Sequence, residues 1–192
     1  IMTAACFIAG STAMQIGYGA TTVVNASLLV NTATILTPAV AWLITGIRPS
    51  ATVWAAAAMT LGAIRLMGGS GLSELGWGDA MCLLSAVCFA LWFVYLGQFL
   101  QAGGDPAAIT IVQLVMAGLV CCAAGAAIEP LQWRGIVGGL PELAVLGVLS
   151  SGLAYLLQAI AQKHTAACVA AVIVSAEAVF GAMSGVALLG EA

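Results

Sequence analysis

The hydrophobic positions of this 192-residue chain fall into long runs, separated by short turns rich in glycine, proline and polar residues. The hydrocarbon core of a bilayer is about 30 Å thick, so a helix needs roughly 20 mostly apolar residues to cross it. The runs reach about this length, and the chain carries no charge before Arg48. The pattern predicts seven membrane-spanning helices, at about residues 1–18, 21–46, 51–68, 79–100, 106–128, 141–162 and 165–190.

Two residues set the expected local geometry of these helices. Asp79 stands at the start of the run 79–100, and its carboxylate is a preferred group for capping a helix N-terminus. Pro38 lies inside the run 21–46, where it removes one backbone hydrogen bond. We therefore expect a helix capped by Asp79, and a kink near Thr34, whose carbonyl Pro38 leaves free.

Composition supports a membrane location. Hydrophobic residues make up 63% of the chain and charged residues 6%, and the mean hydropathy is +1.16. A soluble domain carries roughly 25% charged residues, and so few charges could not cover a water-facing surface of this size. The expected fold class is an all-α integral membrane protein, a polytopic bundle of about seven transmembrane helices. Nucleic-acid binding is excluded, because it needs a basic stripe and the net charge is −3.

The residues needed for metal, cofactor or enzyme chemistry are not suitably placed. The six cysteines lie in apolar runs without a C-x-x-C pair, which favours helix packing over a metal site or a disulfide framework. An intramembrane enzyme needs a serine–histidine pair, two aspartates or a metal cluster at membrane depth. The single histidine, His164, ends a helix, and Asp79 and Asp105 lie at helix starts. We expect no catalytic residue, metal, cofactor or enzymatic activity, and the sequence contains no nucleotide-binding G-x-x-x-x-G-K-S/T motif.

Two of the predicted helices resemble each other. The first starts at Thr21 and Thr22 and ends at Gly46, and the second starts at Thr165 and ends at Gly190. Each follows a helix that ends in polar residues, and the two are nearly equal in length. By the span count they cross the bilayer in opposite directions, which is the pattern of an inverted-topology repeat in a transporter.

Six further motifs extend over most of the chain. They are TTVVNASLL (21–29) followed by Pro38, WGDA (77–80) followed by Phe89 and Ala90, GLAYLLQ (152–158), QKHT (162–165), SAEAVF (175–180) and LLGE (188–191). In order and spacing they resemble the EamA-type transporters of the drug/metabolite transporter (DMT) superfamily. The sequence departs from that pattern at Ile47, where many relatives have glutamate, and at Ala178, where a proline often stands.

The resemblance implies a ten-helix protein made of two inverted five-helix repeats. This chain would be a fragment that holds the third to ninth helices. Residues 1–69 would be the C-terminal part of the first repeat, 70–78 the loop between the repeats, and 79–192 the second repeat without its last helix. The turns at Arg48 and Lys163 would lie in the cytoplasm.

The implied function is secondary transport of small organic metabolites, such as amino acids, amines or drug-like solutes, across the plasma or inner cell membrane. Export by alternating access is the expected direction and mechanism. The alternative is a non-transporting membrane scaffold, or an inactive fragment of such a transporter. The expected partners are the lipid bilayer and a small-molecule substrate. A close-packing motif at Gly181 and Gly185 favours a contact within the chain, and a homodimer stays open.

Glu177 is the most distinctive candidate for binding substrate or a proton. It lies at the midpoint of the predicted helix 165–190. Placing an ionised carboxylate at this depth costs at least ~2.5–3.5 kcal/mol, so intramembrane acids are usually functional. The alternative is a neutral carboxyl that is hydrogen-bonded to a neighbouring helix.

A polar stripe on the predicted helix 141–162 is the second candidate. Ser151, Tyr155, Gln158 and Gln162 are spaced to share one helical face. Such a face turns toward a partner helix or a wet cavity, because lipid cannot satisfy polar groups. We expect Ser151, Tyr155 and Gln158 to line a cavity, whereas Gln162 marks the helix end. The alternative is hydrogen bonding between helices.

The remaining candidates are single polar or aromatic residues at membrane depth. Asn31 and Thr34 come just before Pro38, where a loosened backbone can offer carbonyls to a ligand. Gln113 is an isolated amide in the predicted helix 106–128. Trp92 belongs to an aromatic face that is more typical of packing than of a solute path, but it completes the set of expected cavity residues.

Overall fold

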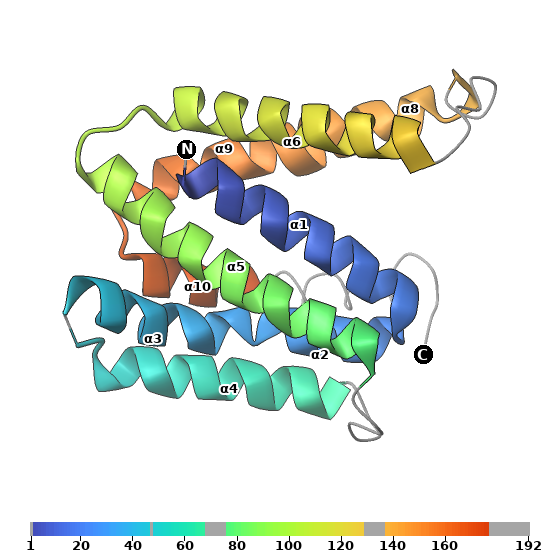
Figure 1. Ribbon diagram of the computed structural model, residues 1–192. Coiled ribbons are helices and arrows are strands. Elements are labelled where there is room, and N and C mark those ends of the chain that lie inside the picture. Colours follow the sequence, from blue (N-terminus) through green and yellow to red (C-terminus); the bar gives the residue numbers. More distant parts are fainter. Residues whose placement is uncertain (1, 47, 68–75, 129–136, 177–192) are drawn as a thin grey trace.

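The computed structural model describes residues 2–46, 48–67, 76–128 and 137–176 (Figure 1). Within these ranges all regular secondary structure is helical, which confirms the predicted all-α class. The elements are α1 (Met2–Ala20), α2 (Val23–Asn31), α3 (Ala33–Thr45), α4 (Ala51–Met67), α5 (Trp77–Gln101), α6 (Pro106–Ile128), α8 (Leu140–Ala144), the π-helix η1 (Val145–Leu153), α9 (Ala154–Gln162) and α10 (Ala167–Ser175).

The helix boundaries follow the predicted apolar runs closely. α1, α4, α5 and α6 each begin and end within two residues of the predicted limits. The predicted helix 21–46 is built from α2 and α3, and the predicted helix 141–162 from α8, η1 and α9. α10 is the described start of the predicted helix 165–190, whose residues from 177 onward lie outside the described ranges.

Four helical segments of the described part are long and apolar enough to cross a bilayer. They are Asn25–Thr45, Trp77–Gln101, Pro106–Ala127 and Leu140–Gln162. α1 has 19 residues but carries several polar ones, and α4 has 17 residues. At 1.5 Å per residue these two helices are about 26–29 Å long, close to the thickness of the hydrocarbon core. The chain is a polytopic membrane protein, and the count of seven spans stays a prediction.

The break in the second predicted helix lies at Thr32, two residues earlier than the kink expected at Thr34. The Thr32 N–H donates to the Leu29 carbonyl at 3.1 Å, which tightens the last turn of α2. The Thr32 hydroxyl donates to the same carbonyl at 2.5 Å. Threonine hydroxyls that bond back to the preceding turn bend helices. Pro38, the expected cause of a kink near Thr34, lies inside α3, and the break in the helix comes just before α3, at Thr32.

The sixth predicted helix contains the nine-residue π-helix η1 where an ordinary α-helix was expected. π-helices are rare and occur mostly as single turns, frequently at functional sites. A π turn holds more residues than an α turn, so residues before Ala154 do not follow the 3.6-residue spacing. Ser151 lies in η1, whereas Tyr155 and Gln158 lie in α9. The sequence spacing alone therefore does not show whether the side chains of Ser151, Tyr155 and Gln158 face the same way.

α5 is the central helix of the bundle. It packs against α1, α2, α3, α9 and α10. α6 covers α1 and α9, and α4 lies against α3 and α10. Figure 1 shows the result as three tiers: α6 with α8 and α9, then α1 and α5, then α2 and α3 with α4. Side chains on α5 can therefore contact both outer tiers.

The contact between α1 and α5 depends on small residues. A β-carbon built on Gly17 would lie 2.4 Å from the Cys82 sulfur, and one built on Gly78 would lie 2.6 Å from the backbone carbonyl carbon of Ala20. The Ser85 hydroxyl donates to the Gly10 carbonyl of the facing helix at 2.9 Å. Close approach of helix backbones through glycine is a usual way to pack helices in a bilayer.

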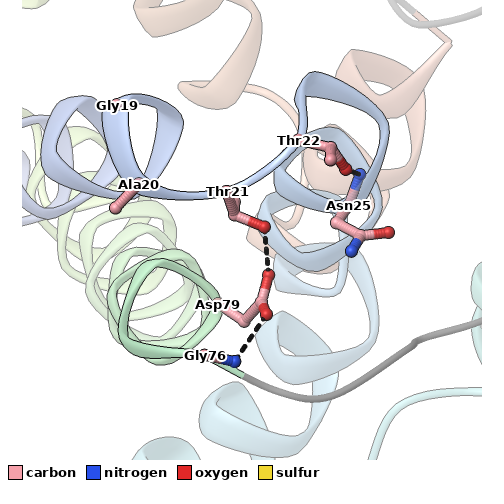
Figure 2. Close-up of a pocket in the computed structure, with 7 residues that line it drawn as sticks. All are labelled: Gly19, Ala20, Thr21, Thr22, Asn25, Gly76 and Asp79. Atoms are coloured by element: carbon pink, nitrogen blue, oxygen red, sulfur yellow. Dashed lines mark hydrogen bonds between the residues drawn. The ribbon is translucent and has the colours of Figure 1, made fainter.

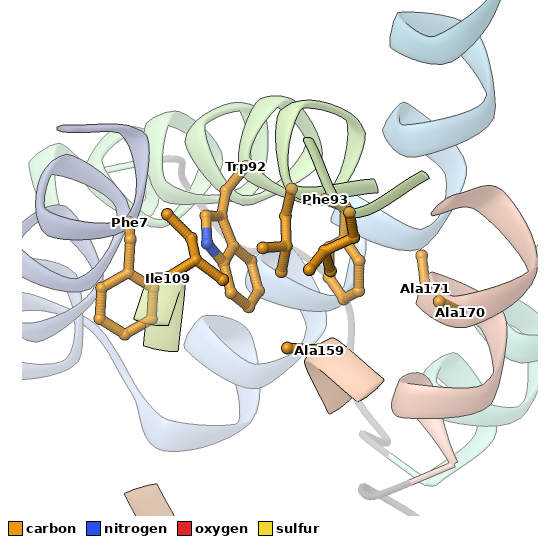
Figure 3. Close-up of a cluster of buried hydrophobic side chains, with 9 residues drawn as sticks. Phe7, Trp92, Phe93, Ile109, Ala159, Ala170 and Ala171 are labelled. Carbon is orange, nitrogen blue, oxygen red and sulfur yellow. The ribbon is translucent and has the colours of Figure 1, made fainter. Parts of the chain in front are cut away.

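The main hydrophobic cluster of the described residues joins α1, α5, α6, α9 and α10 (Figure 3). Most of its volume comes from large side chains of α1 and α5, and small alanines of α9 and α10 fit against them. Its members are Phe7, Trp92, Phe93, Leu96, Leu100, Ile109, Ala159, Ala170 and Ala171. The cluster closes one side of the cavity described next.

Candidate functional site

The described residues line a cavity of about 650 Å³. Its walls come from α1, α2, α3, α5, η1, α9 and α10. Rings and hydroxyl or amide side chains supply most of the lining, and none of the described lining residues is charged. The volume lies in the range of small-molecule sites, about 300–1,000 Å³.

The cavity lies at the middle depth of three candidate membrane spans. Phe89 is the middle residue of Trp77–Gln101, and Ser151 is the middle residue of Leu140–Gln162. Thr34 is next to the middle residue of Asn25–Thr45. All three side chains line the cavity. A polar cavity at this depth must be formed by protein groups facing one another, because lipid offers them no hydrogen bonds.

One wall of the cavity is aromatic and centres on Trp92. The ring centroids of Phe7 and Tyr155 lie 5.3 Å and 5.8 Å from that of Trp92, and those of Phe93 and Phe89 lie 5.1 Å and 6.2 Å away. The Trp92–Tyr155 planes meet at 89°, an edge-to-face arrangement. Such pairs each add about 0.5–1.5 kcal/mol beyond their area burial, so the rings hold one another in place.

Another part of the cavity lining is polar and comes from α2 and α3. Ser27, Asn31 and Thr34 lie on one face at helical spacing and all line the cavity. The Asn31 side-chain amide donates to the Ser27 carbonyl at 2.8 Å, and the Ser27 and Tyr18 hydroxyls are 3.4 Å apart. These bonds hold the Asn31 and Ser27 side chains of this polar part of the lining in place.

Gln158 brings a hydrogen-bond donor to the cavity from α9. Its Nε2 atom is buried and has no hydrogen-bond partner among the described residues. An unpaired buried donor costs about 1–3 kcal/mol, so it is poised to bond a ligand or water. Ser150, Ser151 and Tyr155 line the same region of the cavity. This part of the site therefore suits a hydrogen-bond acceptor on a small molecule.

A second pocket, of about 470 Å³, lies at the turn between α1 and α2 (Figure 2). Asp79 is its acidic residue, but Thr21 donates its hydroxyl to Oδ1 at 2.6 Å and the Gly76 N–H donates to Oδ2 at 2.9 Å. Both carboxylate oxygens are therefore already used within the chain. Figure 2 shows that the carboxylate links the α1–α2 turn to the start of α5. The pocket is a structural junction.

The same bonds correct the capping prediction for Asp79. α5 begins at Trp77 and its N-cap is Gly76, so Asp79 is the third residue of the helix. Its carboxylate reaches back to the Gly76 N–H, as an acidic residue does in a capping box. The sequence placed the start of the helix two residues too late, because Trp77 and Gly78 were taken as part of the turn.

The family model of the EamA-like transporter family matches residues 76–192, which is more than half of the chain. The chain belongs to the EamA-like transporter family. This family is part of the DMT superfamily, so the chain is a membrane transporter of the DMT type. No curated protein and no solved structure matched the chain in the other two comparisons.

The matched residues form only part of the cavity of this EamA-like transporter. α5, η1, α9 and α10 belong to the matched range, whereas α1, α2 and α3 precede it. The cavity lies between these two parts of the chain. Transporters with internal repeats bind their substrates at the interface between repeats.

Six of the eight candidate residues of this EamA-like chain line the one cavity. They are Asn31, Thr34, Trp92, Ser151, Tyr155 and Gln158. Gln113 is fully buried on α6 and is not among the lining residues. It accepts a hydrogen bond from Trp92, which lines the cavity. Glu177 lies outside the described residues. Whether the six bind a solute stays a prediction.

The predicted stripe on helix 141–162 ends before Gln162. Ser151, Tyr155 and Gln158 line the cavity, but Gln162 is fully buried and its Nε2 donates to the Phe93 carbonyl at 3.2 Å. Gln162 therefore ties α9 to α5, where the sequence suggested only a helix-end residue. The spacing alone could not show this, because the acceptor lies on another helix.

Several cavity residues were not among the sequence candidates. Ser27 had a usable signal, because Ser27, Asn31 and Thr34 follow helical spacing on one face. Tyr18 and Met14 share a face of α1, but other polar residues of α1 were equally good candidates for lining a cavity on sequence grounds. The remaining ones have no polar pattern of their own; they include Phe89, Phe93 and Ser150.

Proposed function

We propose that this chain acts in secondary transport and moves small organic metabolites, such as amino acids, amines or drug-like solutes, through the 650 Å³ cavity. The observation that carries the proposal is the position of the cavity, at the middle depth of three candidate spans and between the matched and preceding parts of the chain. A site at the centre of the bilayer can open to either side in turn. The proposed direction is export across the plasma or inner cell membrane by alternating access.

Transport should be tested with the natural full-length protein in proteoliposomes, against a labelled panel of amino acids, amines and organic cations. We expect the protein to carry at least one of these solutes, in exchange with itself or with protons. A protein that is folded and inserted but carries none of them in either direction would contradict transport and favour a membrane scaffold.

Cysteine labelling tests whether the cavity admits water and solute. Single cysteines at Tyr155 and Gln158 should react with a small water-soluble thiol reagent at least about tenfold faster than cysteines at Leu153 and Ile160, because thiolate formation is suppressed in lipid. The first two residues line the cavity, whereas Leu153 and Ile160 are each 46% exposed on the outside of the helix.

The six native cysteines are removed in the background for this measurement. A carried solute should slow labelling at residues 155 and 158 and leave residues 153 and 160 unchanged. Equal, low reactivity at all four positions would show that the polar residues only join helices, and that solute binds elsewhere.

Glu177 lies outside the described residues, and its proposed role in binding substrate or a proton rests on its position in the sequence. We expect Glu177→Gln to lower the transport rate or to change its pH dependence while the protein still inserts, because glutamine keeps the shape of the side chain and cannot exchange a proton. The measurement is the initial rate of transport between about pH 5.5 and 8.5, a range that spans neutral pH. A variant with the wild-type rate and pH profile would mean that Glu177 has a structural role only.

A further inference from the structure

A thin layer of side chains separates the central cavity from the pocket at the α1–α2 turn, here called the turn pocket (Figure 2). On α1, Tyr18 lines the cavity and the next residue, Gly19, lines the turn pocket. On α2, Ser27 lines the cavity and Asn25 lines the turn pocket. On both helices the lining therefore changes from one space to the other within two residues, and Tyr18 and Ser27 are the cavity-lining residues nearest the turn.

Tyr18 is the largest side chain of this layer. It packs against a small hydrophobic cluster that joins α2 to α5. The buried members of the cluster are Ala26, Leu29 and Cys82. On α5, Cys82 comes between Asp79, which lines the turn pocket, and Phe89, which lines the cavity. Tyr18 and this cluster therefore occupy the boundary between the two spaces on all three helices.

The hydrogen bond across this layer is weak. The Tyr18 and Ser27 hydroxyl oxygens are 3.4 Å apart, and hydroxyl pairs usually bond at about 2.5–3.0 Å. α2 has nine residues and lies between the α1–α2 turn and the break at Thr32. Hinges are usually a few residues at the ends of such elements. Neither Tyr18 nor any residue of α2 belongs to the described main hydrophobic cluster, so both can move while that cluster stays packed.

We propose that the Tyr18 side chain is a gate between the central cavity and the turn pocket, and that a solute passes between these two spaces when this side chain moves out of the layer. The passage of solute rests on the proposed transport function, whereas the closure of the layer by Tyr18 does not. The turn pocket is then the vestibule at this end of the cavity. The bonds of Asp79 to Thr21 and Gly76 hold the frame of the vestibule in place while Tyr18 moves.

The gate is tested by one-sided labelling of a cysteine inside the cavity. Ser151→Cys is made in the natural full-length protein, with the native cysteines replaced by serine, and the protein is placed in sealed proteoliposomes. A charged methanethiosulfonate, which does not cross bilayers, is added on the side of the α1–α2 turn. Labelling should be slow while Tyr18 is present. Tyr18→Ala should make it at least about tenfold faster, because the reactivity of a thiol depends on its access to water.

Met14→Ala is the matched control on the same helix. Met14 also lines the cavity, but it lies one helical turn farther from the turn pocket than Tyr18. This variant should leave the labelling of residue 151 within about twofold of the parent rate. Gly19→Cys, in the turn pocket, reports which vesicles present this side of the protein to the reagent. If Tyr18→Ala does not fold, Tyr18→Leu, which keeps an apolar side chain but is shorter, takes its place.

Three results would overturn the gate. They are fast labelling of residue 151 while Tyr18 is present, unchanged slow labelling when Tyr18 is replaced, and equal acceleration by Met14→Ala, which would indicate general loosening of α1. The labelling needs no transported solute, so its outcome is separate from that of the proposed function. A protein that labels as expected but carries no solute of the transport panel would contradict transport and support the closure by Tyr18. A protein that transports but shows any of the three results would contradict the gate alone.

Discussion

Replacing Gly78 with alanine is expected to lower the free energy of unfolding by about 1–3 kcal/mol, the usual cost of overpacking a close contact. The new β-carbon would lie 2.6 Å from the Ala20 carbonyl carbon and 2.9 Å from the Thr21 nitrogen. These are backbone atoms at the α1–α2 turn, so the clash cannot be relieved by rotating a side chain. α5 would have to move away from α1, which also pulls Asp79 away from Thr21. Thermal unfolding of the detergent-solubilised protein measures the effect.

Gly19→Ala is the control for this substitution. Gly19 is also helical and lies close to the same turn, but a β-carbon there meets no atom within 4 Å. Alanine costs less backbone entropy than glycine in a helix, so this variant should be neutral or up to about 1 kcal/mol more stable. Equal unfolding temperatures for the two variants would mean that α1 and α5 have room to separate and do not depend on glycine.

A tryptophan at Ser151 is expected to reduce transport at least about tenfold, which corresponds to roughly 1.4 kcal/mol in the barrier. Ser151 is the middle residue of the span Leu140–Gln162 and lines the cavity, so the large ring takes up volume that a solute needs. The measurement is the initial transport rate in proteoliposomes, corrected for the amount of inserted protein.

Leu149→Trp is the matched variant in the same π-helix. Leu149 is 55% exposed and is not among the cavity-lining residues, so tryptophan there meets lipid. This variant should keep a transport rate within about twofold of wild type. If Ser151→Trp transports at the wild-type rate while remaining folded, the solute path does not pass through the cavity.

The sequence predicted the helices well because the bilayer restricts the choices. A run such as 106–128 is too apolar and too long to be anything other than a spanning helix, and α6 matches it residue for residue. Irregular backbone was harder to predict. At the break, the Thr32 hydroxyl donates to the Leu29 carbonyl, and η1 is a π-helix inside an otherwise α-helical span. Neither leaves a distinct pattern in composition or period.

The candidate site could be predicted in part for a related reason. Polar side chains such as Asn31 and Gln158 cannot face lipid, so their presence at membrane depth already indicates a cavity or a bond between helices. Which of these two applies is decided by the partner, and the partner lies on another helix. Gln113 and Gln162 are bound by Trp92 and Phe93, respectively, and only the structure could show this.

The rings around Trp92 have a consequence for how this family member tolerates change. Phe7, Trp92 and Tyr155 come from three different helices, and each ring contacts the other two. The energetic effects of mutations at contacting residues do not add. A smaller ring at one position alters the space available to the other two, so the cost of a second substitution depends on the first. Substitutions that keep the protein stable are therefore expected to occur together at these three positions, although the positions lie far apart in the sequence.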